Sequence, residues 1–512
     1  MAVFRLVVLA VAVAAVLGGS VQPVALPAVN GVARGRGLKG APRREGAAAT
    51  APALVAAASS AASGPGGTSD VPTSVFNLAK TILGAGVLSL PSGVAAFSDD
   101  LSGLAPASAL LVVMGIISAY SFASIGRACR LHKTTSFAEA WAKSVDSPGS
   151  AVLISSVITF KTFFACLAYS IIVGDSFSSI GKTLGLPPVL TGRSNVILGL
   201  TALVIFPLCL LKNLDALKTT SMLGLGGILY CALFMVVRLV TGSYPQPPAA
   251  AAAAAARSPK ASSAVFVLIS MISTAYVAHY NAPKFYNDLK NKDDYNLVVV
   301  AAFGFAALMY MTVMWAGFLS FGRHSTGFIL NNYASSDKAA TVARLAIGLA
   351  ILFGYPLTFG ALREGVFDLV GVPGGVVVSS GSGGRGVAAA KTKASSRREE
   401  LAVPATVGLI GLITALSLVL KNLGLVVSFS GALIGAMLIY TVPAIMNIGN
   451  IRRGAGAGGK DKGRGGGGGG ESQAAALTTR QRAEVAANVA MAAMGCVIAV
   501  IGVATTLKGA GH

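Results

Sequence analysis

The chain has 512 residues, of which 54% are apolar and only 12% are charged. Soluble proteins carry roughly a quarter charged residues, so this deficit excludes an ordinary soluble globular protein. The net charge of +21 resembles that of a nucleic-acid-binding protein, but the basic residues lie in short segments between apolar runs. We therefore expect an integral membrane protein with the lipid bilayer as its partner, and no nucleic acid.

Residues 1–20 combine an early Arg5 with an apolar stretch and then small residues, which is typical of a signal peptide or a signal anchor. Residues 21–70 are rich in Arg, Ala and Ser and poor in acidic residues, as in a transit peptide or a disordered segment. Together the two segments resemble the bipartite presequence of algae with complex plastids. Whether residues 1–70 are cleaved stays open.

After Asp70, apolar segments of about 20 residues, the length that crosses a bilayer, recur between polar or low-complexity breaks. We expect eleven spans, at residues 73–97, 103–125, 150–177, 194–211, 219–241, 263–281, 295–321, 340–362, 403–421, 425–448 and 483–507. A Gly-rich basic loop over 451–482 separates the last span and its tail, 483–512, from the others.

The first span carries the residues that a membrane helix tolerates least. Gly84, Gly86, Pro91 and Gly93 lie within one apolar run, and glycine costs about 1 kcal/mol and proline about 3 kcal/mol in a helix interior. In lipid, each backbone group freed by a break needs a partner. A helix that is broken at mid-depth therefore tends to line a binding site.

The loop charges predict an orientation. If the first span starts on the inner side, most loop lysines and arginines fall on the inner side, in agreement with the positive-inside rule. The five cysteines form no CxxC pair, and of the four histidines only His279 lies in an apolar run. We expect no metal site, no cofactor and no enzymatic activity, because no cluster of histidine, acidic or cysteine residues is evident.

Several ordered blocks resemble one family. They are FNLAKTILGAGVLSLP in the first span, YSIIVGD (169–175), PLCLLKNLDALKTTSMLG (207–224), AYVAHYNAPKFYNDLK (275–290), GFLSFG (317–322), YPLTFGALRE (355–364) and FSGALIGAMLIYTVPAIMNI (429–448). In this order and at this spacing they resemble the amino acid/auxin permease family, which includes vacuolar and neutral amino acid transporters. The likeness covers residues 72–450.

The resemblance implies an all-α multi-span membrane protein with a leucine-transporter-like inverted repeat of 5+5 helices plus an eleventh helix. The ten-span core would cover 71–450, with repeats at about 73–241 and 263–448. The sixth span is short and is interrupted at residues 280–283, at the position that matches the break of the first span. Paired interruptions of this kind predict a site at the membrane midplane.

An amino acid brings a carboxylate and an ammonium to such a site. We expect backbone amides near Gly84, Ala85 and Gly86 to bind the carboxylate, helped by the positive end of a half-helix. Carbonyls in the sixth span would bind the ammonium, and the candidate residues there are Ser273, Thr274, Ala275 and Tyr276. The alternative is that the glycines only let helices pack closely.

The coupling ion depends on charged residues inside spans, which are functional candidates by default. Lys80 lies beside Asn77 in the first span, where sodium-coupled relatives have no charge, and Gly354 stands where those relatives carry a hydroxyl residue. These features favour H+ over Na+ as the co-transported ion, with Asn77, Lys80 and His279 as ion-coupling candidates. Lys161, in the third span, is a functional candidate for the same reason, and the alternative is that it extends toward the membrane surface or lies at a water-filled vestibule.

The resemblance thus implies a secondary active, monomeric amino acid transporter that works by alternating access, with proton coupling as symport or antiport. Sodium coupling and a non-transporting amino acid sensor on the same fold remain alternatives. We expect an endomembrane or vacuolar location, and the plastid envelope of a complex-plastid alga is the alternative.

Overall fold

The computed structural model describes residues 67–98, 100–211, 215–244, 263–372, 385–462 and 477–509. The expected signal peptide, nearly all of the segment 21–70 and part of the loop 451–482 lie outside these residues. The part of the chain that is described is almost entirely helical, and its one β contact is an isolated parallel bridge between Ser69 and Leu289.

The first half of the chain forms one interrupted helix followed by several long helices. These elements are α2 (Val71–Ile82), η2 (Ala85–Ser89), α3 (Leu90–Phe97), η3 (Leu101–Gly103), α4 (Leu104–His132), α5 (Phe137–Val145), η4 (Pro148–Ser150), α6 (Ala151–Thr183), α7 (Pro188–Thr191), α8 (Arg193–Leu200), a π turn (Thr201–Ile205), α9 (Phe206–Leu210) and α10 (Asp215–Val240).

The second half begins with another interrupted helix. Its elements are α12 (Val265–Tyr276), η6 (His279–Asn281), α13 (Ala282–Asp288), η7 (Lys292–Asp294), α14 (Tyr295–Phe321), η8 (Gly322–His324), η9 (Ile329–Asn332), α15 (Lys338–Leu369), α16 (Arg385–Val419), α17 (Leu423–Ser430), two π turns (Gly431–Gly435 and Met437–Thr441), α18 (Val442–Lys462) and α19 (Thr479–Gly509).

Each expected span falls on a helix or on an interrupted helix. Within the described ranges, nine helices are long and apolar enough to cross a membrane. A tenth candidate is the pair Val71–Ile82 and Gly86–Phe97, which is bent by 45° at its break, and α10 contains the shorter apolar stretch Gly224–Val240. The expected all-helical, multi-span fold class is therefore confirmed.

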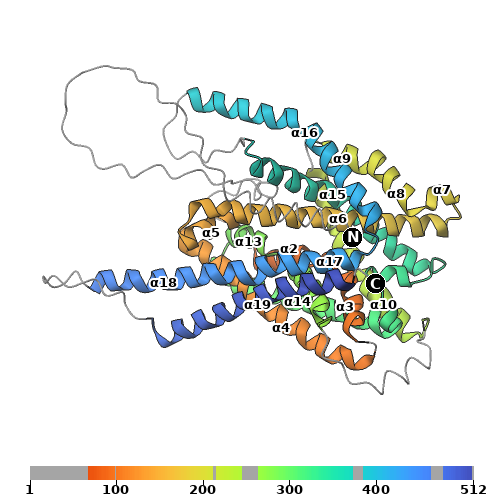
Figure 1. Ribbon diagram of the computed structural model, residues 1–512, viewed down its shortest axis with the longest axis horizontal. Coiled ribbons are helices and arrows are strands. Elements are labelled where there is room, and N and C mark those ends of the chain that lie inside the picture. The colour runs from red at the N-terminus through yellow and green to blue at the C-terminus, as the bar shows by residue number, and fades with distance from the viewer. Residues whose placement is uncertain are drawn as a thin grey trace.

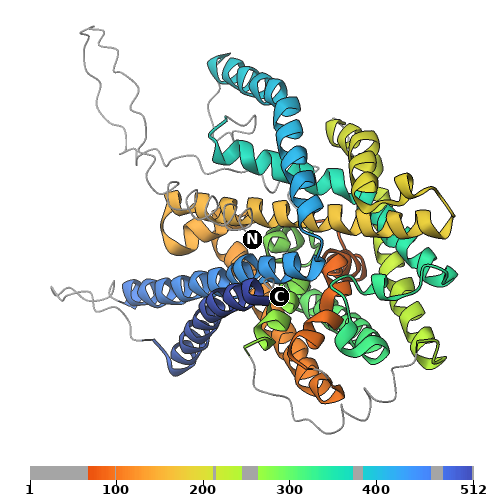
Figure 2. The ribbon, with the colours of Figure 1, turned by 45° about the vertical axis from the view of Figure 1, so that its right-hand side comes forward.

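The long helices pack around the two interrupted ones. Helices α6 and α18 both run along the long axis of the molecule (Figures 1 and 2). Helix α12 contacts α3, α17 and α19, while α14 contacts α2 and α4, and α15 packs along α6 and α10. Leu268 and Ile272 of α12 are fully buried. This packing surrounds both helix interruptions with other helices.

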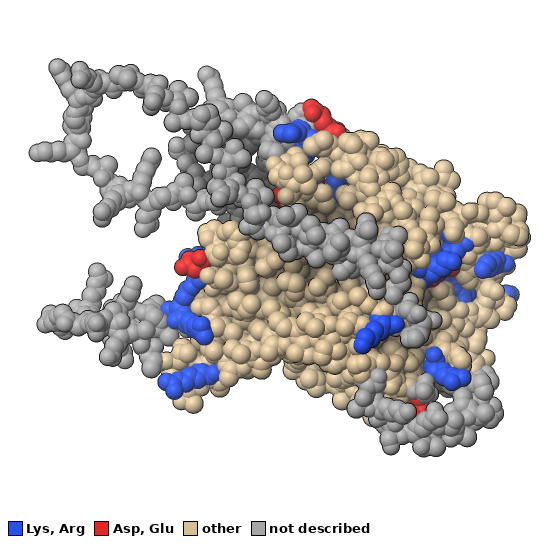
Figure 3. Space-filling view, viewed as in Figure 1, with Lys and Arg blue, Asp and Glu red and all other residues tan. Residues whose placement is uncertain are grey.

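Helix starts follow local capping rules. The Asp70 side chain accepts a hydrogen bond from the Thr73 N–H at 3.2 Å, and proline occupies the first turn of α2. This is a favourable helix start because the first amides have no partner within the helix. On the face shown in Figure 3, lysine and arginine side chains gather toward the two ends of the long helices and leave an uncharged band between them. That band is the surface expected to face lipid.

Candidate functional site

The first interruption lies at Leu83 and Gly84. Helix α2 ends at Ile82, Gly84 is extended (φ −105°, ψ 178°), and η2 begins at Ala85. The Leu83 N–H donates to Ala79 O at 2.8 Å, and the Gly84 N–H donates to Ile82 O at 2.8 Å. The first amides of the following turn, at Ala85 and Gly86, have no partner within their own helix because a helix leaves its first N–H groups unpaired.

The second interruption lies at Val277 and Ala278, between α12 and η6. This is three residues before the interruption that the sequence predicts at 280–283. Pro283 lies in the first turn of α13, where proline fits because the missing N–H would have no helical partner. The Thr274 hydroxyl, in the last turn of α12, donates to Val427 O of α17 at 2.6 Å.

A cavity of about 310 Å³ lies between the two interruptions. Its wall is built from both interrupted helices and from α6, α15 and α17. The lining residues include Thr81, Ile82, Gly84 and Gly86 at the first interruption, Thr274, Ala275, Val277, Tyr280 and Asn281 at the second, and Lys161, Thr162, Phe164, Tyr169, Thr358, Val427 and Ser430 from the other helices. Cavities of this size accommodate small molecules.

A second cavity, also of about 310 Å³, adjoins the first through the shared residues Thr81 and Leu357. It lies between α2 and the end of α13, on the side of the membrane that the loop charges predict to be the inner side. We call this cavity the inner vestibule, and its lining residues are Ser69, Ser74, Asn77, Lys80, Thr81, Lys284, Phe285, Asp288 and Leu357.

Lys161 is the one charged side chain among the residues that line the central cavity. Its Nζ donates to the Tyr280 hydroxyl at 2.8 Å and lies 4.5 Å from the centre of the Tyr280 ring. An ammonium over an aromatic face is stabilised by the ring quadrupole. The structure therefore places the Lys161 ammonium at the central cavity, against Tyr280.

The substrate-binding candidates differ in the direction they face. Four of these candidates line the central cavity, namely Gly84, Gly86, Thr274 and Ala275. The side chains of two others, Ser273 and Tyr276, contact neighbouring helices instead. The Ser273 hydroxyl donates to Ile269 O at 2.9 Å and lies 3.3 Å from the Tyr440 hydroxyl. The Tyr276 hydroxyl donates to Leu111 O at 3.4 Å.

The ion-coupling candidates fall into two places. Asn77 and Lys80 line the inner vestibule. His279 is fully buried among other side chains and lines neither cavity. Its Nε2 lies 2.8 Å from Ser121 Oγ and 3.0 Å from Ser118 O of α4. In this structure His279 therefore joins two helices and has no direct path to the vestibule.

Sequence reasoning missed Tyr310. This residue of α14 is fully buried, and its hydroxyl oxygen lies 2.7 Å from Ile82 O and 2.6 Å from Ala275 O. The two carbonyls belong to the last turns before the two interruptions. The only signal in the sequence is a single tyrosine within the apolar run ALMYMTVMW, which packing in an apolar helix explains equally well.

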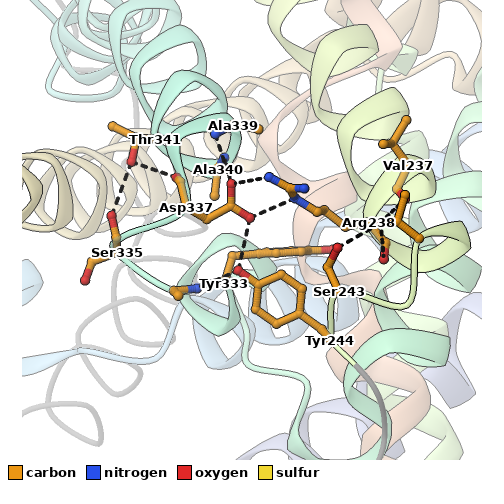
Figure 4. Close-up of polar contacts among 12 residues, drawn as sticks. Val237, Arg238, Ser243, Tyr244, Tyr333, Ser335, Asp337, Ala339, Ala340 and Thr341 are labelled. Carbon is orange, nitrogen blue, oxygen red and sulfur yellow. Dashed lines mark hydrogen bonds and ion pairs between the residues drawn. The ribbon is translucent and has the colours of Figure 1, made fainter.

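A polar cluster made of Arg238, Tyr244 and Asp337 joins α10 to the start of α15 on the opposite, outer side (Figure 4). Arg238 donates to the two Asp337 oxygens at 2.9 and 2.8 Å, and the Tyr244 hydroxyl donates to Asp337 Oδ2 at 3.0 Å. Burial acts to raise the pKa of Asp337, but the hydrogen bonds from Arg238, the Ala340 N–H and Tyr244 outweigh it and hold that pKa below its usual value.

Comparison with known proteins identifies relatives of this helical core. The family described as "Transmembrane amino acid transporter protein" matches residues 67–455. Vacuolar amino acid transporter 5 of Schizosaccharomyces pombe is 28% identical over 58% of this chain and 69% of its own length. Sodium-coupled neutral amino acid transporter 7 of Bos taurus is 28% identical over 57% of this chain and 63% of its own length.

Among solved structures, that of MhsT in complex with L-phenylalanine superimposes with a TM-score of 0.48 at 11% identity, over 85% of this chain and 98% of the other. The family match spans most of the described helices, including both interruptions, and its members are transporters rather than enzymes. The chain belongs to the transmembrane amino acid transporter family.

Proposed function

We propose that the protein is a secondary active transporter that moves amino acids across a membrane by alternating access. The observation that carries this proposal is the central cavity between the two helix interruptions. A zwitterion presents one anionic and one cationic group, each of which is costly to remove from water. Interrupted helices offer amides and carbonyls at the same depth and can replace the lost water for both groups.

The substrate carboxylate would bind to amides at the start of η2, near Gly84 and Gly86, and Lys161 would supply a positive charge within the same cavity. The substrate ammonium would bind to carbonyls at the end of α12, where Thr274 and Ala275 line the wall. Helix ends favour these signs of charge, because an N-terminus is partly positive and a C-terminus partly negative.

We further propose that transport is coupled to protons. The charged residues that line the two cavities are Lys161, Lys80, Lys284 and Asp288, so lysines outnumber carboxylates along the described walls. This surplus of positive charge repels sodium, whereas a lysine can release and rebind a proton. Sodium coupling is the second candidate, because the name of one relative states that it is sodium-coupled.

An endomembrane location, such as the vacuole, is the location we propose, on the strength of a vacuolar relative. Fluorescence microscopy of the tagged full chain in its native cells tests this point. Its result also defines the direction of transport, because the compartment fixes which face of the membrane is acidic.

Uptake of radiolabelled amino acids into proteoliposomes that contain the purified full chain tests function and coupling together. We expect accumulation in sodium-free buffer when an inwardly directed proton gradient is imposed, and its loss when a protonophore is added. Uptake that needs sodium and ignores the proton gradient would support the second candidate. No uptake of any amino acid under either gradient would reject the transport function.

Within the same assay, Lys80→Asn tests the residue that we propose for proton coupling. The variant removes the vestibule ammonium but keeps a polar side chain, so we expect uptake that depends less on the proton gradient than in the wild type. The exposed Lys508 near the end of α19 provides a matched control, Lys508→Asn, which should respond to the gradient as the wild type does. An unchanged response in Lys80→Asn removes Lys80 from the mechanism.

A further inference from the structure

Tyr310 bridges the two helix interruptions. Its hydroxyl oxygen lies within hydrogen-bond distance of Ile82 O, the last residue of α2, and of Ala275 O, in the last turn of α12. The two acceptors are 228 and 35 residues away in sequence. Helix geometry leaves the last carbonyls of a helix without partners, so Tyr310 supplies a partner where both helices lack one.

Three short contacts at this point share two hydrogens. A tyrosine hydroxyl has a single hydrogen and donates it to one carbonyl at a time. Ile82 O also receives the Gly84 N–H at 2.8 Å. When the Tyr310 hydrogen points to either carbonyl, the other oxygen is left facing an oxygen at short range. Ile82 O keeps the Gly84 hydrogen in either case, so Ala275 O is the carbonyl that lacks the Tyr310 hydrogen when the hydroxyl points to Ile82 O. Ala275 lines the central cavity, where a donor can reach it.

Two backbone carbonyls that converge from interrupted helices are the kind of ligand that binds a monovalent cation in a membrane protein. Here the Tyr310 hydroxyl occupies the point between them. It carries a partial positive charge on its hydrogen and is held covalently by α14. A bound ion at this point would keep the two half-helices at a fixed separation. Here the Tyr310 side chain has that role.

We propose that Tyr310 is a positioning residue of the transport site whose hydroxyl replaces a bridging monovalent cation. When this hydroxyl donates to Ile82 O, it leaves Ala275 O to accept a hydrogen from the substrate ammonium. This inference rests on the proposed function, since it assumes an amino acid in the central cavity. It goes further by assigning the alignment of the two helix interruptions to a residue on a third helix.

The variant that tests the inference is Tyr310→Phe. It removes the hydroxyl and keeps the ring, which packs edge-on against Tyr276 with centroids 5.1 Å apart. Tyr295→Phe is the matched control, because Tyr295 is also a buried tyrosine of α14 whose hydroxyl donates to one carbonyl, Ala282 O at 3.3 Å. Uptake is measured at a fixed proton gradient, in sodium and in N-methyl-D-glucamine buffers, with KM and maximal rate determined separately.

We expect the KM of Tyr310→Phe in sodium-free buffer to rise about tenfold, as expected when a buried acceptor loses its donor. Sodium should restore most of this loss, because the two carbonyls become free to hold the ion with cavity water around it. For the wild type and for Tyr295→Phe, the KM should be the same in the sodium buffer and in the sodium-free buffer. Sodium should also raise the melting temperature of purified Tyr310→Phe in detergent, without substrate, and leave the wild type unchanged.

The inference is overturned if sodium changes neither the uptake nor the melting temperature of Tyr310→Phe, whether the uptake of this variant is normal or lost. If this variant does not fold in sodium buffer, Tyr310→Met is measured instead. Failure of both to fold there, while Tyr295→Phe folds, also overturns the inference, since sodium did not replace the hydroxyl. A wild type that takes up no amino acid rejects the proposed function, and the sodium-induced melting shift then still tests the role of Tyr310.

Discussion

Gly84 and Gly86 differ from the glycines that serve only to bring helices together. A Cβ added at Gly86 would lie 3.7 Å from Thr274 Cγ2, an ordinary contact, and one at Gly84 would meet only Ile82 O at 4.0 Å. At Gly431, by contrast, a Cβ would collide with the carbonyl of Ser270. The space beside Gly84 and Gly86 therefore belongs to the cavity, which supports the ligand-related interpretation of these two glycines over close packing.

Gly86→Leu should fill part of the cavity without disturbing the helices around it. We expect uptake to fall by at least about tenfold, since a pocket filled by the protein itself cannot hold its ligand, while the melting temperature in detergent stays near that of the wild type. Gly304→Leu is the matched control, because Gly304 lies on α14 with open space around its Cβ position and outside both cavities. Uptake equal to the wild type in Gly86→Leu would contradict the site.

Lys161→Met tests the charge in the central cavity. Methionine keeps the length of the side chain but cannot attract a carboxylate, so we expect the KM for amino acids to rise about tenfold, the size of a charge-assisted hydrogen bond. Lys182→Met, at the exposed end of the same helix, should leave the KM unchanged. Equal KM values for Lys161→Met and the wild type would show that the substrate does not use the ammonium.

The two interrupted helices depend on neighbouring helices that remain continuous. Helix α14 provides Tyr310 for both interruptions, and α17 provides the Val427 carbonyl for Thr274. On the outer side, α10 and α15 are joined through Arg238 and Asp337. The continuous helices thus provide hydrogen-bond partners at both interruptions.

Asp337→Asn should weaken the connection between α10 and α15. The Asp337 side chain is only 7% exposed, so loss of its charge leaves Arg238 with a poorer partner and should lower the free energy of unfolding by about 1–3 kcal/mol at neutral pH. The exposed pair of Arg130 and Asp293 offers Asp293→Asn as the control, with a change near zero.

The effect of Asp337→Asn should depend on pH in a definite direction. Because the pKa of Asp337 in the folded protein is held below its ordinary value, the stabilisation is complete above that ordinary value and is lost as the pH falls through the folded-state pKa. Melting temperatures of variant and wild type should therefore converge only below about pH 4. Convergence already at neutral pH would contradict the stated role of the carboxylate.

At the scale of the whole molecule, the two cavities are arranged in series. The central cavity meets the inner vestibule at Thr81 and Leu357. On the predicted outer side lie the Arg238, Tyr244 and Asp337 cluster and Arg344, whose guanidinium donates to Leu330 O and Tyr333 O at 2.8 and 2.6 Å. The two described cavities therefore lead from the site toward the predicted inner side.

Asn77→Cys tests this arrangement by labelling. Among the described cysteines, only Cys496 is exposed, so Cys496→Ser provides a background with low reactivity. In oriented vesicles, a membrane-impermeant maleimide should label Asn77→Cys when added on the inner side, and bound amino acid should slow the labelling. Labelling from the outer side alone would contradict both the predicted orientation and the order of the two cavities.

The first interruption could be predicted from the sequence because its cause is local. Gly84 and Gly86 weaken the helix wherever they stand. The second was predicted three residues too late, because Pro283 begins a new helix instead of ending the previous one. The orientations of Ser273 and Tyr276 depend on how α12 is rotated against its neighbours, and the role of Tyr310 depends on a contact with a segment 228 residues away. Neither is encoded in a local pattern.

The short bridge between Ser69 and Leu289 has a mechanical consequence. The Ser69 N–H donates to Asp288 O at 3.0 Å, and the Lys290 N–H donates to Ser69 O at 2.9 Å. These two hydrogen bonds connect the chain just before α2 to the chain just after α13. The inner halves of both interrupted helices should therefore move together. A chain cut between Ser69 and Val71 would remove this coupling, because Ser69 would stay bonded to the end of α13 while α2 would lose its connection to Ser69.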